Sequence, residues 1–162
     1  MGTSESAPPA SPLRVDFYII EDPSGNGRLN LACKLAEKAY LADQRVLIWH
    51  TDPAELKALD DMLWTFRDGS FVPHEMLSQG QGPCEDDSDG GTSTAPVALS
   101  SGALPASSLD VVINLAADVP EFVAQSKRIV EIIDGDPGRR AAGRARFKAY
   151  RERGVQPGSH NL

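Results

Sequence analysis

The 162-residue sequence predicts a single α/β domain in which helices flank an open, mostly parallel sheet. Segments rich in β-branched and aromatic residues alternate with segments whose apolar residues recur at helical spacing. Hydrophobic residues make up 41% of the chain and charged residues 24%, an ordinary globular balance that excludes wholesale disorder. We assign residues 14–154 to the domain, and expect a disordered extension over 1–13 and a tail over 155–162.

The first three elements form a strand–helix–strand unit. Arg14–Ile20 is rich in β-branched and aromatic residues and ends in a turn with Pro23 and Gly25, so it predicts a strand, placed centrally in the sheet. Good helix formers separate the apolar residues of Arg28–Asp43, and a second strand follows at Arg45–His50. This order predicts a βαβ unit with a right-handed crossover and a parallel pair of strands.

The alternation continues to the end of the domain. A capping Asp52 and a proline at the first helical position predict a helix over Asp52–Phe66. Residues 75–95 are rich in Gly, Ser, Thr and acidic residues and predict a mobile loop. Two strands, a segment that is either a strand or a helix leading into a strand, and a final helix follow: Pro96–Leu99, Asp110–Leu115, Phe122–Asp134 and Arg139–Arg153.

The final helix concentrates positive charge in an acidic chain. Arg139–Arg153 holds seven Lys or Arg and one Glu, whereas the whole chain has 16 basic and 23 acidic residues. At 100° per residue, one face of this helix carries four cations and an aromatic ring: Arg140, Arg144, Phe147, Lys148 and Arg151. A charged face often serves only solubility, but an aromatic among the cations favours a site for an acidic partner. We expect the helix to pack on the sheet through a face of small residues: Ala141, Ala142, Ala145 and Ala149.

No arrangement of residues predicts catalysis, a metal site or a cofactor site. The turn Asp22–Arg28 is glycine-rich, but it lacks the Lys-Ser/Thr pair of a P-loop and the third glycine of a dinucleotide fingerprint. The histidines at 50, 74 and 160 are far apart in sequence, and one at a strand end, such as His50, is more often a satisfied polar group than a base. The residues therefore favour a binding protein over an enzyme.

A second group of bulky apolar residues lies around the end of the second helix: Trp64, Phe66, Phe71, Val72 and Pro73. Two interpretations remain open for them. Trp64 fits the apolar face of its helix and could belong to the core. Alternatively, this much apolar bulk next to a short loop indicates a groove for a partner.

The chain has no features of secretion or of membrane insertion. Its N-terminus lacks the basic and apolar regions of a signal peptide, and no apolar run is long enough to span a membrane. Cys33 and Cys84 show no metal-ligand spacing and indicate reduced thiols, so we expect a cytoplasmic protein. A net charge of −7 opposes non-specific nucleic-acid binding by the whole surface.

With these two surfaces located, the sequence resembles the chi subunit family of bacterial DNA polymerase III holoenzyme, from about Val15 to Gly154. Three pieces carry the resemblance: FYII in the first strand, LWTFRDGSFVPH at 63–74, and RARFKAYRERG at 144–154. The resemblance implies a Rossmann-like fold without catalytic activity or cofactor. It also implies an adaptor that binds the acidic, Phe-terminated C-terminal tail of single-stranded DNA-binding protein.

The resemblance implies that the tail site includes Arg140, Arg144, Phe147, Lys148 and Arg151. Phe147 replaces the tyrosine, and Arg140 the lysine, that are usual in the family, and both replacements keep the ring and the cation. The adaptor would reach the clamp loader through the psi subunit, on a surface that can also engage an accessory helicase: Trp64, Phe71, Pro73 and His74. Two other functions stay open, a basic helix that binds single-stranded nucleic acid directly and a degenerate nucleotide-binding enzyme.

Overall fold

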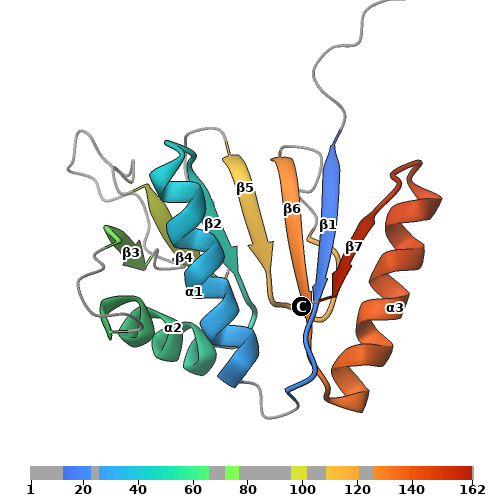
Figure 1. The fold of residues 1–162 in the computed structure, drawn as a ribbon, viewed down its shortest axis with the longest axis horizontal. Helices are drawn as coiled ribbons and strands as arrows, with labels where there is room; N and C mark the ends of the chain where they lie inside the picture. Colours follow the sequence, from blue (N-terminus) through green and yellow to red (C-terminus); the bar gives the residue numbers. More distant parts are fainter. Residues whose placement is uncertain are drawn as a thin grey trace, which may run out of the picture.

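A computed structural model describes residues 13–22, 26–65, 72–76, 96–101, 109–120 and 126–161. Within these ranges seven strands form one sheet in the order β3-β4-β2-β5-β6-β1-β7, and every neighbouring pair is parallel (Figure 1). The predicted α/β fold is confirmed. The elements in chain order are β1 (Arg14–Ile19), α1 (Asn26–Leu41), β2 (Val46–Trp49), α2 (Pro53–Thr65), β3 (His74–Met76), β4 (Val97–Ser100), β5 (Leu109–Asn114), β6 (Ser126–Ile133), α3 (Pro137–Glu152) and β7 (Gly158–Asn161).

The order of the strands differs from the expected one in two respects. β1 and β2 are parallel, but β6 and β5 lie between them, so they are not a neighbouring pair. β1 lies next to the edge strand β7 and is not central. A continuous apolar strand is one that is buried on both faces of the sheet. All inner strands are buried in this way, so their apolar residues do not indicate the order of the strands.

Two short strands lie in segments that the sequence assigned to a loop and a tail. β3 includes Glu75 and Met76 of the expected mobile loop, and the rest of that loop, residues 77–95, lies outside the described residues, as do residues 1–12. β7 pairs with β1 near the C-terminus, where Gly158 lies opposite Asp16. A Cβ on Gly158 would lie 3.1 Å from Asp16 Oδ1, so glycine lets the strand approach this carboxylate closely.

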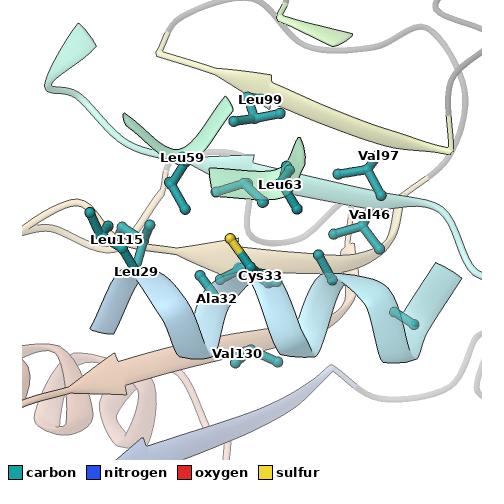
Figure 2. Packing of buried hydrophobic residues seen from close by; sticks show 14 of the residues in the cluster. Leu29, Ala32, Cys33, Val46, Leu59, Leu63, Val97, Leu99, Leu115 and Val130 are labelled. Carbon is teal, nitrogen blue, oxygen red and sulfur yellow. The ribbon is translucent and has the colours of Figure 1, made fainter. Parts of the chain in front are cut away.

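The core has two layers, one on each face of the sheet. Successive residues of a strand point to opposite faces. In β2, Ile48 belongs to the cluster that contains side chains of α1 and α2, whereas Leu47 belongs to the cluster that contains Tyr150 of α3. Figure 1 shows α1 and α2 over the half of the sheet near β2 and β4, and α3 at the opposite end beside β7. Figure 2 shows Cys33 among the side chains that α1, α2 and the sheet bring together. Burial raises the pKa of the Cys33 thiol to about 12, so this cysteine is an inert core residue. Cys84 lies outside the described residues.

The helices begin and end at the residues that favour such ends. Asp52 Oδ1 accepts a hydrogen bond of 2.9 Å from Ala54 N at the start of α2, which confirms the predicted cap. Asp136 Oδ2 accepts one of 2.9 Å from Arg139 N, so α3 begins at Pro137, two residues before the predicted start. α1 is followed by Asp43, whose φ of 64° is the left-handed conformation typical of a helix C-terminus.

The packing face of α3 differs from the predicted alanine face. The buried residues of this helix are Gly143, Arg146 and Tyr150, whereas Ala141 and Ala145 are exposed. Gly143 permits a close approach to the sheet, because a Cβ there would lie 2.2 Å from Ile133 Cδ1. The predicted alanine face was wrong because the helix packs through Arg146, a charged residue whose partner Glu131 lies on the sheet.

Candidate functional site

The exposed side of α3 carries an open groove of 580 Å³. Its lining consists of three cations, one aromatic ring and one carboxylate: Arg144, Phe147, Lys148, Arg151 and Glu152. The three cations are exposed to solvent, and none of them has a protein ion pair within the described residues. The groove is therefore open to an anionic ligand.

Phe147 forms the apolar part of this groove. It is only partly buried, and its ring centroid lies 5.2 Å from that of Phe17 on β1 with an angle of 56° between the ring planes. Tilted aromatic pairs at this distance attract each other, so Phe17 holds the Phe147 ring in place. The exposed aromatic expected from the sequence is thus a half-buried ring that offers one face to the groove.

Arg140 is the expected site residue that does not line the groove. Its Nε donates a hydrogen bond of 3.0 Å to the backbone oxygen of Asp134, the residue after β6. The side chain is half-buried in this position. The structure therefore brings together four of the five predicted residues, and places Arg140 nearer the start of the helix.

A buried polar network beneath the groove fixes α3 to the sheet. Glu131 of β6 is fully buried and accepts hydrogen bonds from Arg146 Nε at 2.8 Å, from the Tyr150 hydroxyl at 2.6 Å and from Asn114 Nδ2 at 2.9 Å. Burial raises the pKa of Glu131, although the charge of Arg146 and the hydrogen bonds from Asn114 and Tyr150 act in the opposite direction. Burial, followed by the charge of Glu131, raises the pKa of Tyr150.

The sequence reasoning missed this network. A glutamate inside the apolar run of β6 was the one available signal, because a charged residue in such a strand needs a partner. The partner, Arg146, is one of seven cations in the segment 139–153, and spacing alone does not distinguish it from the exposed ones.

The second predicted surface contains an exposed aromatic. Trp64 is 52% exposed, so it does not belong to the core, and its ring centroid lies 4.7 Å from that of His74. His74 Nδ1 donates to the Val72 oxygen at 2.7 Å, and its Nε2 lies 3.0 Å from Asp60 Oδ1. Pro73 is partly buried, and Phe71 lies outside the described residues. The β3 edge thus presents a Trp–His pair in a fixed arrangement.

The residues considered for catalysis have structural partners. His50 Nε2 donates to Glu55 Oε1 at 2.7 Å, while its Nδ1 accepts from Asp52 N at 3.2 Å, so this histidine is the satisfied polar group that we expected. Gly27 N donates to Asp22 Oδ2 at 3.1 Å, so a carboxylate of the chain already occupies the start of α1. The described residues contain no group of three or more His, Cys, Asp or Glu that could hold a metal ion.

Fold and surface together define a class of protein. The last helix of a parallel α/β fold carries a cationic groove lined by one aromatic ring, and His50 and the start of α1 have partners within the chain. These are the features of a binding subunit on a Rossmann-like scaffold. None of the helices within the described ranges has the length and hydropathy of a membrane span.

Comparison with known proteins identifies the family. The family model for DNA polymerase III chi subunit, HolC, matches residues 13–158. The chain is 38% identical over 149 residues to DNA polymerase III subunit chi of Pseudomonas aeruginosa, with 92% of this chain and 96% of that protein covered. It is 29% identical over 143 residues to DNA polymerase III subunit chi of Escherichia coli, with 85% and 90% covered. The chain belongs to the DNA polymerase III chi subunit family.

This membership gives the general role of the chain. It is a non-catalytic accessory subunit of DNA polymerase III and acts in DNA replication. The expectation of a chi-like protein without activity of its own is confirmed, and the degenerate nucleotide-binding enzyme is excluded as its main function.

Proposed function

We propose that this chain is an adaptor that binds the acidic, Phe-terminated C-terminal tail of single-stranded DNA-binding protein and links it to the clamp loader through the psi subunit. One observation supports this most: on α3, three exposed cations surround the anchored ring of Phe147 in a single groove. A peptide with carboxylates followed by a terminal aromatic ring has the matching chemistry.

Each groove residue has a defined part in the proposed complex. The terminal phenylalanine of the tail packs on Phe147, and Arg144 offers its planar fork of donors to the terminal carboxylate. Lys148 and Arg151 interact with the preceding acidic residues. Arg140, outside the lining, adds to the positive field at the start of the helix. Because these pairs are exposed, added salt weakens them over a Debye length of about 8–10 Å.

Titration of a fluorescent tail peptide by anisotropy tests this proposal. We expect micromolar affinity, about −8 kcal/mol, for the parent chain. Arg144→Ala and Lys148→Ala should each weaken binding about tenfold, or about 1.4 kcal/mol. Lys38→Ala is the matched control, because Lys38 is an exposed lysine of α1, away from α3, and its loss should leave the affinity unchanged.

Two further measurements separate this function from direct nucleic-acid binding. Deletion of the last phenylalanine of the peptide should abolish binding, because the ring supplies the apolar contact with Phe147. A gel shift with naked single-stranded DNA at moderate salt should show no complex, since the chain has a net charge of −7 and a single cationic helix face. The proposal would be overturned if the chain bound DNA strongly and the groove variants bound the peptide as tightly as the parent chain.

We propose that Trp64, Phe71, Pro73 and His74 form the contact with psi, and that an accessory helicase can use the same residues. An exposed tryptophan held by a ring contact is a typical anchor of a protein interface. Trp64→Ala should reduce co-purification with the psi subunit, while the exposed change Lys57→Ala on the same helix should not. We also place the protein in the cytoplasm, because replication subunits act there.

A further inference from the structure

A second cavity, of 330 Å³, lies outside the carboxyl ends of β2, β5 and β6. Residues after β2 and after β5 line it, and α3 forms another wall. β2 and β5 are neighbours in the sheet. After β2 the chain continues through α2 toward the β3 edge, whereas after β5 it continues to β6, toward the β7 edge. Ligands of open parallel α/β proteins bind at points where neighbouring strands lead away in opposite directions.

Three arginines line this cavity: Arg28 of α1, and Arg139 and Arg146 of α3. Two of them are held by fully buried carboxylates. Arg139 Nη2 lies 2.7 Å from Asp134 Oδ2, and Arg146 Nε lies 2.8 Å from Glu131 Oε1. Because these carboxylates cannot move, the two guanidinium groups are fixed before any ligand arrives.

Arg28 has a different environment. It is 3% exposed, and its Nε has no hydrogen-bond acceptor within the part of the chain that the structure describes. Its Nη2 lies 2.7 Å from Glu55 Oε1, the oxygen that His50 Nε2 also contacts at 2.7 Å. Glu55 lies at the rim of the cavity in the first turn of α2, with 35% of its side chain exposed. The counterion of Arg28 is therefore a partly exposed carboxylate, and the exposed Asp52 is a second acidic residue of the lining.

The charges on the two sides of the cavity influence each other. Burial acts to raise the pKa of Asp134, but hydrogen bonds from Arg139 and the charge of Arg28, among others, outweigh it and lower this pKa. Glu55 likewise contributes to the raised pKa of Arg139, after the larger effect of Asp134. Arg28 and Arg139 thus share one electrostatic environment, to which the partly exposed Glu55 also contributes.

We propose that this cavity binds a small phosphate-bearing ligand, no larger than a mononucleotide, with Arg28 and Arg139 as donors to the phosphate. The phosphate takes the position at Arg28 that the Glu55 carboxylate holds in the free chain. Arg28 has donor capacity for such a ligand, because its Nε has no acceptor among the described residues and its Nη1 reaches the Leu115 oxygen only at 3.4 Å. The volume lies at the lower end of the range for ligand pockets, about 300 Å³.

This site is separate from the proposed tail groove. The two cavities share no lining residue, because α3 contributes Arg139, Ala142 and Arg146 to one and Arg144 and Lys148 to the other. The inference therefore does not rest on the proposed tail binding, and either can fail alone.

Side-chain NMR of the full chain tests the proposal. The Nε–Hε signals of arginine are recorded while inorganic phosphate, adenosine monophosphate or acetate is added. Phosphate or the nucleotide should shift the Arg28 and Arg139 signals saturably, and acetate should bind more weakly because it has fewer acceptor oxygens. A response to phosphate alone would show that the ligand of the cavity is the inorganic ion. A stronger response to the nucleotide would show that the ligand is an organic phosphate.

Two variants make the test specific. Ala142→Leu fills the wall of the cavity and should weaken binding about tenfold, while Ala145→Leu, at an exposed position of the same helix, should not change it. Glu55→Gln should tighten binding, because it removes the competing charge. Any of three results would overturn the proposal: no saturable shift in the parent chain, binding of acetate as tight as that of phosphate, or no increase in phosphate affinity in Glu55→Gln. The Glu55→Gln result does not depend on whether Ala142→Leu folds.

Discussion

Glu131 determines which side of α3 faces the solvent. Its carboxylate receives three donors, two of them from α3, and it is fully buried. Arg146 and Tyr150 are one helical turn apart, so both lie on the side of the helix that faces β6. Arg144 and Lys148, each two positions from Arg146, consequently point outward into the groove.

Loss of the arginine in this pair should destabilise the chain strongly. Arg146→Met leaves the carboxyl of Glu131 buried without its cation, a change that typically costs about 3–5 kcal/mol. Urea unfolding measures the difference. Arg144→Met is the control at an exposed position, with an expected change of about 0.5 kcal/mol or less. Equal stability of the two variants would mean that the ion pair does not fix the helix.

At the scale of residues, the sequence indicated charge but not partners. Arg144, Phe147, Lys148 and Arg151 were predicted on one face, and the structure places them in one groove, because helical periodicity is a local property. The burial of Arg146 could not be predicted, since its partner Glu131 is brought close by the packing of α3 on β6.

At the scale of elements, α3 depends on its first turn. Asp136 caps the helix through Arg139 N, and it precedes Pro137 at the first helical position. Asp136→Ala should cost about 1 kcal/mol in the free energy of unfolding. Asp61→Ala, which removes only an exposed ion pair with Lys57, should cost no more than about 0.5 kcal/mol. A cap variant as stable as this control would contradict the assignment.

The carboxylate of Asp16 helps to hold β7 on the sheet, and its ionisation depends on pH. Burial acts to raise the pKa of Asp16, but hydrogen bonds from His160 and Arg128, and the charges of Arg128 and Arg14, outweigh it and lower the pKa. A lowered pKa stabilises the fold above the usual aspartate value, and this contribution is lost as the pH falls below about 4. Asp16→Asn should therefore be less stable than the parent at neutral pH.

Urea unfolding at a series of pH values checks this expectation. The stability difference between the parent and Asp16→Asn should begin to shrink as the pH falls below about 4, where the unfolded chain takes up a proton. It should be lost below the lowered pKa of Asp16, where the folded parent also carries a neutral side chain. A difference that stays constant between neutral and acid pH would show that the ionisation of Asp16 does not hold β7.

The predicted ends of the three helices lie within two residues of the observed ones, because capping residues and apolar spacing are local signals. β3 and β7 were not predicted, since three or four residues at a sheet edge, most of them polar, are too few to show a periodicity of their own. β7 depends instead on contacts distant in sequence, such as the stacking of Tyr18 on His160 with ring centroids 4.8 Å apart.

At the scale of the whole molecule, the two proposed partner surfaces lie at opposite ends of the sheet. Trp64 and His74 belong to the end with β3, while α3 lies beside β7 (Figure 1). An adaptor needs this separation, because both partners must bind at once. The sequence predicted both surfaces but not their separation, which follows from the strand order.

The separation predicts independent binding. Trp64→Ala should leave the affinity for the tail peptide unchanged within about 0.5 kcal/mol, because distant sites without shared partners act additively. Anisotropy titrations of the parent and the variant with the same peptide measure this. A clear loss of peptide affinity would mean that the two surfaces form one site.

The central claim is that the tail binds in the α3 groove, and a ¹⁵N-resolved NMR titration of the full chain with the tail peptide tests it most directly. We expect the largest shifts on Arg144, Phe147, Lys148 and Arg151, and expect these shifts to disappear with a peptide that lacks its terminal phenylalanine. Largest shifts around Trp64 and His74, or equal shifts with the shortened peptide, would contradict it.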